Sequence, residues 1–433
     1  MNTVTILFVL PLLIIFSYLF DAFARKTKFP SVILLMFTGI LVRAITSAYG
    51  LDSFGFLDNL IPVLGTIGLI LIVLEGALEL KLSKEKLPLI VKGFFAALII
   101  LILNIAALQW VFVHLFDMDS GLATLSAIPL SIISSAVAIP SAASLLDWDR
   151  EFVVYESTFS DILGIMIFNY SLNQVESNQP LVGGSSLIGL GIQIIGVIVI
   201  SLVITYVLVR ILQQIKHHVK FFLILALLIL VYAIGKLLHL PALVTIFIFG
   251  VFLSNLNQLL PRFLRRYLDI EQTEKGLHEF HILTAESTFI VRTFFFLFFG
   301  FSIQITAFTS LNPILYGLLL FAIMLVLRYL YFAISRVQLK PTALVYMSPR
   351  GLISILLFIQ LKEVTFIDSH NSPIDDRVLL IIILSSMLVM LMGTLKKKTN
   401  SENEEPSETE GANNEPIDID AADPLIENDT NTD

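Results

Sequence analysis

The sequence predicts an all-α membrane protein with about 13 transmembrane helices. Composition is the first observation: 56% of the residues are hydrophobic and only 14% are charged, whereas soluble domains are nearer half apolar and a quarter charged. The second is that the apolar residues gather in runs of about 20, the length of a helix that crosses a bilayer. The third is the distribution of basic residues between these runs. Cys is absent, which excludes disulfides and thiolate metal sites.

The apolar runs divide the chain into about 13 predicted spans. The eighth and ninth come from one long apolar run that is interrupted by the stretch from Gly235 to His239 and by Pro241, and a single bent span is the alternative there. Merging them would place the basic loop 257–282 outside, which the charge pattern argues against. In chain order the spans lie near residues 4–20, 30–47, 59–80, 89–115, 122–146, 152–172, 186–210, 220–237, 240–257, 283–303, 311–333, 341–361 and 378–395.

Basic residues alternate between the loops and so predict the orientation of the chain. With the N-terminus outside, the inner loops carry 20 of the 27 Lys and Arg residues and the outer loops carry four. Cytoplasmic loops are enriched in basic residues, so we expect an N-terminus outside and a cytoplasmic C-terminus. Thirteen spans divide into two sets of six and a linking helix, which inverts the second set, as in an inverted repeat. The sequence therefore predicts two inverted six-helix repeats.

The acidic end of the chain forms a separate segment. Residues 399–433 contain twelve acidic residues and no Lys or Arg. Such a composition cannot bury enough apolar surface to fold and is typical of a solvated, disordered extension. These twelve acids account for the negative net charge of the whole chain, −8, because the remainder has a net charge of +4. We therefore expect a transmembrane domain over 1–398 and a disordered acidic cytoplasmic tail over 399–433.

The sixth predicted span carries a carboxylate at membrane depth. Asp161 lies about nine residues into the span, roughly 14 Å along a helix axis. Ser157 lies one turn earlier on the same face, and Glu156 and Ser160 form a second pair with the same spacing. Burial disfavours a charged carboxylate, so a proton and a cation can compete for it near neutral pH. Asp161 is therefore the expected ion site, and a helix-packing hydrogen bond is the alternative.

The fifth predicted span is interrupted by prolines and hydroxyl residues. Pro129 and Pro140 flank a run of small residues that includes Ser134 and Ser135. Unwound backbone at membrane depth is tolerated only where it is buried or lines a wet cavity, and its free carbonyl groups can bind cations. We therefore expect a broken helix whose serines contribute to the ion site. A tightly packed, proline-kinked helix is the alternative.

The twelfth predicted span contains a basic residue. Arg350 lies about midway along it, between Pro349 and Gly351. An unpaired arginine at this depth is costly, so it needs an acidic partner. Glu156 is the expected partner in a structural ion pair, which leaves Asp161 free for the ion. Asp161 is the other option for the pair.

Several other kinds of chemistry lack the residues that they need. The sequence has no metal-ligand cluster, phosphate-binding loop, nucleophile elbow or nucleic-acid patch. We therefore expect no enzyme activity, no cofactor and no nucleic-acid partner. Glu75 and Glu79 are expected at the inner interface rather than in a site. Arg292, which precedes an aromatic run, is expected to stack on aromatic rings or to hold a conformational contact.

These residues resemble those of the monovalent cation:proton antiporters of the sodium/proton exchanger type. The resemblance covers about residues 1–396. Its marks are Glu156-Ser157-x-x-Ser160-Asp161, the proline-containing stretch 134–140, Pro349-Arg350-Gly351 and the stretch Leu74-Glu75-Gly76-Ala77-Leu78-Glu79-Leu80. It implies crossed discontinuous helices in a core part, a dimer part, a homodimer, and alternating access by an elevator-like movement.

The resemblance also implies roles for the site residues. The family's aspartate binds the cation or the proton, assisted by the serine of the sixth helix and a threonine of the broken fifth helix, for which Ser134 is the counterpart. The family's glutamate pairs with the arginine of the twelfth helix. This chain departs at Ser160, where asparagine is usual, and at Ser135, where aspartate is usual. A single carboxylate, Asp161, implies an electroneutral one-for-one exchange of Na⁺, K⁺ or Li⁺ for H⁺.

Two other classes of function remain open from the sequence. An ion-coupled symporter of an organic anion would leave Arg350 free to bind the substrate carboxylate. A non-transporting membrane sensor would use the acidic tail as its output. A channel would need rings of carbonyl groups or acids lining its pore, which one Asp and one Arg do not supply. For the antiporter we expect a multi-pass protein of the bacterial inner membrane, in contact with membrane lipids.

Overall fold

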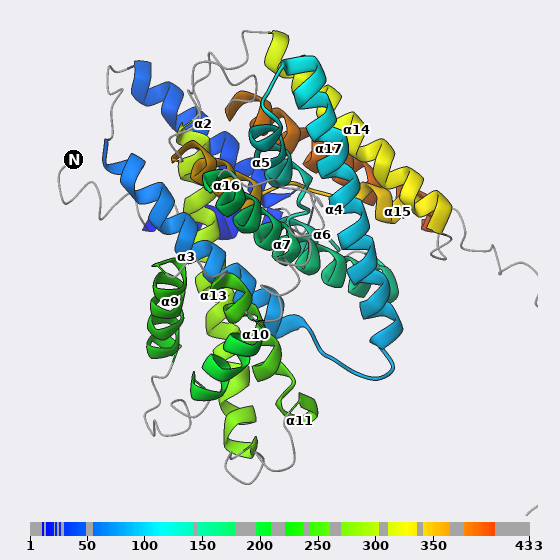
Figure 1. Cartoon of the computed structure of the whole chain (residues 1–433). Helices are drawn as coiled ribbons and strands as arrows, with labels where there is room; N and C mark the ends of the chain where they lie inside the picture. Colours follow the sequence, from blue (N-terminus) through cyan, green and yellow to red (C-terminus); the bar gives the residue numbers. More distant parts are fainter. Residues whose placement is uncertain are drawn as a thin grey trace, which may run out of the picture.

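The computed structural model is helical in every regular element that it describes (Figure 1). No strand occurs within the described ranges. The predicted all-α class is thereby confirmed. The structure describes residues 11–12, 14–20, 22–23, 26, 30–48, 55–142, 145–177, 196, 198–208, 221–237, 242–259, 270–302, 311–335, 341–363 and 376–402.

Six of the described helical segments are long and apolar enough to cross a membrane. Their mean hydropathy is between 1.6 and 2.5. Several shorter apolar helices, such as Phe221–Leu237, accompany them. The six are Ser31–Ala48, Leu87–Phe116, Ser120–Ala142, Leu277–Ser302, Leu311–Ser335 and Asp376–Gly393.

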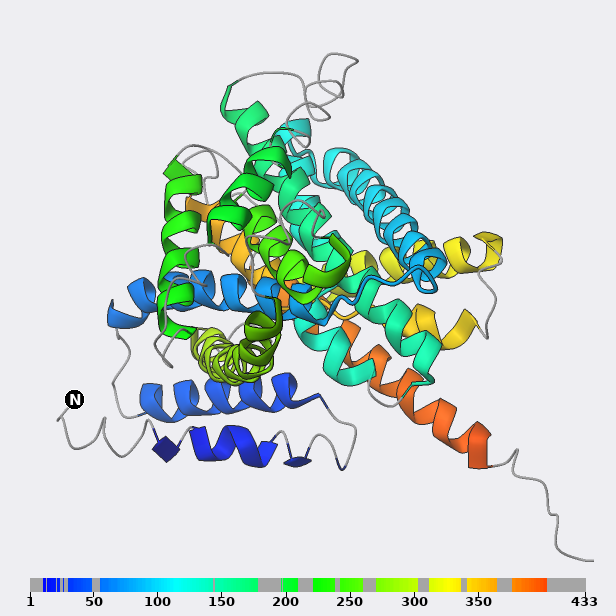
Figure 2. The same ribbon diagram turned by 90° about the horizontal axis from the view of Figure 1, so that it is seen from below.

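The helices pack as two groups that lie side by side (Figure 1). The first, here called the scaffold group, contains α2 (Ser31–Ala48), α3 (Gly55–Glu79), α9 (Phe221–Leu237), α10 (Ala242–Ser254) and α13 (Ile270–Ser302). The second, here called the broken-helix group, contains α4 (Leu87–Phe116), α5 (Ser120–Ser131), α6 (Ser135–Ala142), α7 (Asp147–Glu176), α14 (Leu311–Ser335), α15 (Pro341–Tyr346), α16 (Leu352–Glu363) and α17 (Asp376–Glu402). In the view of Figure 2, α2 again lies beside α13, and both lie apart from α17.

Two of the predicted spans are broken helices. The fifth is divided into α5 and α6 by the extended residues 132–134, and the twelfth into α15 and α16 by residues 347–351. Pro349 lies within the second break and removes a backbone donor that a continuous helix needs, whereas Pro129 and Pro140 lie inside α5 and α6, on either side of the first break. The predicted discontinuous helices are therefore present, each as the fifth of six spans in its predicted set.

Glycines let the scaffold helices approach closely. A methyl group built on Gly39 of α2 would meet the backbone of α13, and one built on Gly300 of α13 would meet the backbone of α2. Such small residues allow backbone contact between membrane helices. α2 and α13 therefore pack directly against each other and give the scaffold group a rigid seam.

The predicted boundaries differ from the observed ones in a few places. α9 and α10 are two helices that pack against each other, which favours two spans over a single bent one. α13 already begins at Ile270, so part of the charged stretch 257–282 is helix. α17 continues to Glu402, and residues 403–433 of the expected tail lie outside the described residues. The first and seventh spans are described only in part.

Candidate functional site

The two helix breaks cross each other inside the broken-helix group. The Ser134 amide donates a hydrogen bond to the carbonyl oxygen of Pro349 over 2.9 Å. Gly351 lies directly against Ser134, because a methyl group at that glycine would come within 2.6 Å of the Ser134 hydroxyl oxygen. One extended segment therefore supplies the backbone partner that the other lacks, which unwound chain at membrane depth requires.

Arg350 caps the first of the two broken helices. Its Nε donates to the Leu130 carbonyl oxygen over 2.7 Å, and its Nη1 donates to the Ser348 carbonyl oxygen over 3.1 Å. Leu130 lies in the last turn of α5, where carbonyl groups have no helical partner. A cation is favourable at this negative end of a helix. The side chain of Arg350 is thus occupied by backbone carbonyl groups.

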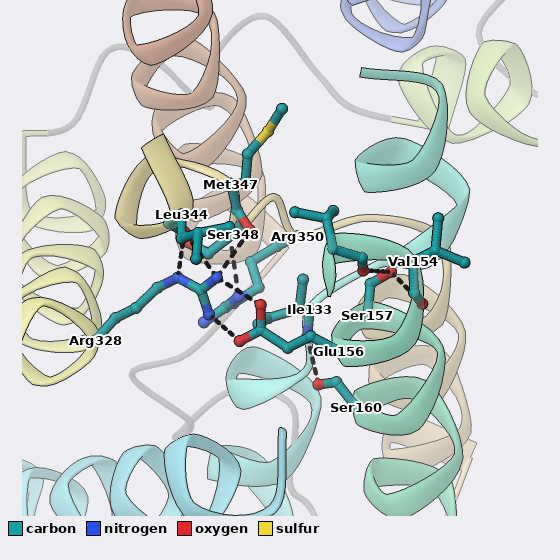
Figure 3. A network of polar contacts seen from close by, with 11 residues as sticks. Ile133, Val154, Glu156, Ser157, Ser160, Arg328, Leu344, Met347, Ser348 and Arg350 are labelled. Atoms are coloured by element: carbon teal, nitrogen blue, oxygen red, sulfur yellow. Dashed lines mark hydrogen bonds and ion pairs between the residues drawn. The ribbon is translucent and has the colours of Figure 1, made fainter. Parts of the chain in front are cut away.

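Glu156 forms its ion pair with Arg328, and the predicted pair with Arg350 is corrected (Figure 3). The Arg328 Nη1 donates to Glu156 Oε1 over 2.6 Å, and the Nη2 donates to Oε2 over 2.8 Å. Both side chains are 1% exposed. The prediction failed because it gave Arg350 an acidic partner, whereas the freed carbonyl groups of α5 satisfy that guanidinium.

Arg328 also caps the second broken helix. Its Nε and Nη2 donate to the Leu344 carbonyl oxygen over 3.0 and 2.8 Å, and Nη2 also reaches the Met347 carbonyl oxygen over 3.2 Å. Leu344 lies in the last turn of α15. The carboxyl-terminal ends of the first pieces, α5 and α15, are therefore each capped by an arginine. Figure 3 shows the two guanidinium groups beside each other, next to the single carboxylate of Glu156.

Asp161 lies at the amino-terminal end of α6. Its Oδ2 accepts a hydrogen bond from the Ser135 amide over 3.1 Å, and its side chain is 2% exposed. The Oδ1 is buried and has no hydrogen-bond partner within the described residues. An anionic group is stabilised at the positive end of a helix. One carboxylate oxygen is therefore held by the break, and the other is available to a further ligand.

Three of the four predicted serines, Ser134, Ser135 and Ser160, lie at or against the first break, and Ser157 lies one turn before Asp161 in α7. Ser160 accepts a hydrogen bond from the Ile133 amide over 3.0 Å, so it satisfies the unwound backbone. The Ser157 hydroxyl donates within its own helix to the Val153 carbonyl oxygen over 2.7 Å, which leaves its oxygen lone pairs unused. The Ser134 hydroxyl is buried without a partner in the described structure. Ser135 contributes the amide that binds Asp161.

A cavity of about 980 Å³ reaches the site between the two groups of helices. Ser135 and Ala136 of α6 form part of its lining, together with Glu75 and Glu79 of α3. The expectation that these two acids lie at the interface rather than in a site is therefore corrected, since they line the route to the break. The charged and titratable lining residues are Glu75, Glu79, Lys81, Lys86, Asp147, Arg150, Glu151, Tyr155, His278, His281 and Arg292.

Sequence reasoning missed the partners of two further arginines. Arg328 lies within the eleventh predicted span, where an intramembrane arginine needs an acid as much as Arg350 does. Arg292 donates to the Ala136 carbonyl oxygen over 3.1 Å. Pro140 could have indicated this contact, because it leaves the Ala136 carbonyl group, four residues earlier, without its helical donor.

Comparison with known proteins agrees with this geometry. A family model described as the sodium/hydrogen exchanger, transmembrane, matches residues 12–396. The sequence has no match among curated proteins. The fold is similar to that of the sodium proton antiporter MjNhaP1 from Methanocaldococcus jannaschii at pH 8, with a TM-score of 0.67 and 19% identity over 92% of this chain and 100% of that chain. An electron-microscopy structure of MjNhaP1 matches with a TM-score of 0.65 and 18% identity over 95% of this chain and 100% of that chain.

The family match and the apolar helices identify a multi-pass membrane antiporter. The chain belongs to the sodium/hydrogen exchanger family, because the family model covers nearly the whole of its transmembrane part. The predicted family resemblance is thereby confirmed.

Proposed function

We propose that the protein exchanges Na⁺ for H⁺ across the membrane, one for one, with Asp161 as the group that binds either ion. The observation that carries this proposal is the buried carboxylate itself. One oxygen is held by the Ser135 amide, and the other has no partner within the described residues. A desolvated carboxylate in this position favours occupation by a proton or a cation over a bare charge.

The neighbouring serines are the proposed oxygen ligands. The Ser134 hydroxyl is buried without a described partner, and the Ser157 oxygen retains its lone pairs. Hard cations prefer oxygen ligands of this kind. Ser160 and the Ser135 amide hold the break and Asp161 in place. The chemistry therefore suits Na⁺, with Li⁺ and K⁺ as the cations to compare.

Electroneutral exchange follows from the number of carboxylates that can change occupant. Glu156 is paired with Arg328, so Asp161 is the carboxylate left to bind an ion. Na⁺ and H⁺ each bring one positive charge to Asp161, so the site has the same net charge in both loaded states and one ion is exchanged for one. An unoccupied Asp161 would be a buried carboxylate with one unpartnered oxygen, which is costly to move through a dry interface, and this cost couples the two ions.

An anion symporter is less well supported by the same contacts. It would need a free arginine at the site for the substrate carboxylate. Arg328 is bound to Glu156 and to two carbonyl groups, and Arg350 is bound to Leu130 and Ser348. A substrate would have to displace these buried hydrogen bonds. The sensor alternative would leave the cavity and the unpartnered oxygens without a role.

The test is a pH measurement in everted membrane vesicles from cells that lack their own antiporters. Vesicles are acidified by respiration and then given Na⁺, Li⁺ or K⁺. We expect the wild type to raise the internal pH after at least Na⁺, and Asp161→Asn to show no response at the same expression level. A well-folded wild type without a response to any of the three cations would refute the proposal.

We further propose that the protein works as a homodimer in a bacterial inner membrane, with the C-terminus in the cytoplasm. Apolar side chains such as Phe37, Leu41 and Ile45 of α2 are exposed on the scaffold group and suit lipid or a second copy. Native mass spectrometry of the purified protein tests the assembly. A monomer at all concentrations in lipid nanodiscs would contradict it.

A further inference from the structure

Arg292 links the two groups of helices at the first break. It belongs to α13 of the scaffold group, and its Nη1 donates to the carbonyl oxygen of Ala136 in α6 of the broken-helix group over 3.1 Å. Both residues line the cavity that reaches Ser135. The hydrogen bond therefore crosses from one group to the other on the wall of the cavity.

The sequence of α6 explains why Ala136 accepts this bond. In an α-helix its carbonyl group would receive the N–H of the residue four positions later. That residue is Pro140, which has no N–H. Ala136 is buried, and an unsatisfied carbonyl group at membrane depth is costly. Arg292 therefore replaces a helical bond that the sequence of α6 cannot make.

Arg292 also lies among charged groups. Glu75 and Glu79 of α3 are within electrostatic reach of its guanidinium group. The other charged or titratable residues of the cavity wall are Lys81, Lys86, Asp147, Arg150, Glu151, Tyr155, His278 and His281. Arg292 therefore has two roles that experiments can separate. It caps the Ala136 carbonyl group, which is needed because of Pro140, and it balances the charge of the acids of α3.

We propose that Arg292 is a positioning residue of the transport cycle. By capping Ala136 it holds α6 against the scaffold group in the conformation whose cavity reaches the ion site. Ser135 is the first residue of α6, and its amide binds Asp161. The hydrogen bond from Arg292 to Ala136 therefore also sets the position of the carboxylate that binds the ion. The proposal rests on the proposed function in treating this conformation as one state of the cycle. When the two groups move past each other, the bond between Arg292 and Ala136 breaks.

The proline provides a specific rescue. Arg292→Gln removes the charged donor, so the conformation that exposes α6 to the cavity becomes less populated. Pro140→Ala restores an N–H for the Ala136 carbonyl group and makes the arginine unnecessary. Glu75→Gln removes the acid that Arg292 faces and leaves the carbonyl group uncapped. The double variant with Pro140→Ala therefore recovers the wild-type behaviour, and the double variant with Glu75→Gln does not.

Cysteine labelling measures the population of the conformation that exposes α6 to the cavity, and it does not depend on a transport assay. The chain has no Cys, so Ile139→Cys, on the cavity wall, is a single reporter for a membrane-impermeant maleimide. We expect Arg292→Gln to slow its labelling about tenfold, as expected from the loss of one charge-assisted hydrogen bond. Adding Pro140→Ala restores the rate. The matched control is Glu85→Cys, an exposed loop residue, which labels equally in both backgrounds.

Transport provides the second readout. Arg292→Gln raises the apparent KM for Na⁺ on the cavity side, and Arg292→Lys, which keeps the charge and one donor, lies between it and the wild type. An unchanged labelling rate at Ile139→Cys in Arg292→Gln would overturn the proposal. So would rescue by Glu75→Gln without rescue by Pro140→Ala. If the wild type exchanges no cation but the labelling pattern holds, the proposed function fails and the positioning of α6 by Arg292 stands.

Discussion

Glu156 and Arg328 meet through two parallel hydrogen bonds of 2.6 and 2.8 Å in the interior of the broken-helix group. The planar guanidinium group matches the two carboxylate oxygens. The same guanidinium group binds the carbonyl groups at the end of α15. The pair therefore connects α7, which carries Asp161, to the second broken helix.

Removing one partner of this pair leaves a buried charge without compensation. We expect Glu156→Gln or Arg328→Gln to destabilise the fold by about 3–5 kcal/mol, the range for a broken buried pair. Thermal unfolding of the purified protein in detergent measures the loss. Lys86→Ala is the control, because the Lys86–Glu151 pair is 38% exposed on both sides and is expected to contribute at most about 1 kcal/mol.

A double-mutant cycle separates the observed pair from the one that the sequence suggested. Residues in contact couple, whereas independent ones add. Glu156→Gln combined with Arg328→Gln should cost less than the sum of the two single changes. Glu156→Gln combined with Arg350→Gln should be closer to additive, because Arg350 is held by carbonyl groups. Stronger coupling in the second cycle would contradict the geometry.

Two neighbouring serines should respond oppositely to removal of their hydroxyl groups. Ser160→Ala strips the Ile133 amide of its acceptor, and an unsatisfied buried donor costs about 1–3 kcal/mol of stability. Ser134→Ala removes a hydroxyl group that has no described partner, so we expect stability to be unchanged and the apparent KM for Na⁺ to rise. Unfolding and vesicle assays on the same preparations compare the two. A Ser134→Ala variant that loses stability but not Na⁺ affinity would reverse these assignments.

The broken helices could be predicted from the sequence, whereas the contacts between them could not. Pro349 lies in the second break, and Pro129 and Pro140 flank the first, so the prolines indicate which spans are broken. The partners of Glu156 and Ala136 depend on which helices lie side by side. Arg328 and Arg350 are equally plausible in sequence, and only the crossing of the helices places the former against Glu156. Asp161 could be proposed from the sequence because a carboxylate stands out in an apolar run.

The close approach of the two breaks requires glycine at position 351. A methyl group there would lie 2.6 Å from the Ser134 hydroxyl oxygen and 2.9 Å from its Cβ, and the extended chain at Ser134 is fixed by its bond to Pro349. We expect Gly351→Ala to displace Ser134 and to reduce the exchange rate at least about tenfold, as misplacement of a site residue does. Gly196→Ala, where nothing lies within 4 Å, is the control. Equal exchange rates in Gly351→Ala and Gly196→Ala would contradict this prediction, because they would show that the two breaks can move apart without loss of transport.

The side to which the cavity opens is predicted by its basic residues. Lys81, Lys86 and Arg150 line the cavity, and such residues mark the cytoplasmic side. We expect an impermeant maleimide to label Glu85→Cys in everted vesicles but not in intact cells. Asp376→Cys, exposed at the start of α17, should show the opposite pattern. Labelling of both from the same side would refute the alternating spans.

Na⁺ should stabilise the fold by binding to it, and protons should weaken this stabilisation by competing with Na⁺ for Asp161. A ligand that binds only the folded state stabilises it by RT ln(1 + [L]/Kd), about 2.7 kcal/mol at a concentration of 100 Kd. If Asp161 holds either ion, lowering the pH raises the apparent Kd for Na⁺, so the thermal shift is large at alkaline pH and shrinks as the medium is acidified. Differential scanning fluorimetry with Na⁺ against choline, at constant ionic strength, measures it. Asp161→Asn should show no Na⁺-specific shift at any pH, and a shift that survives in this variant would place the ion elsewhere.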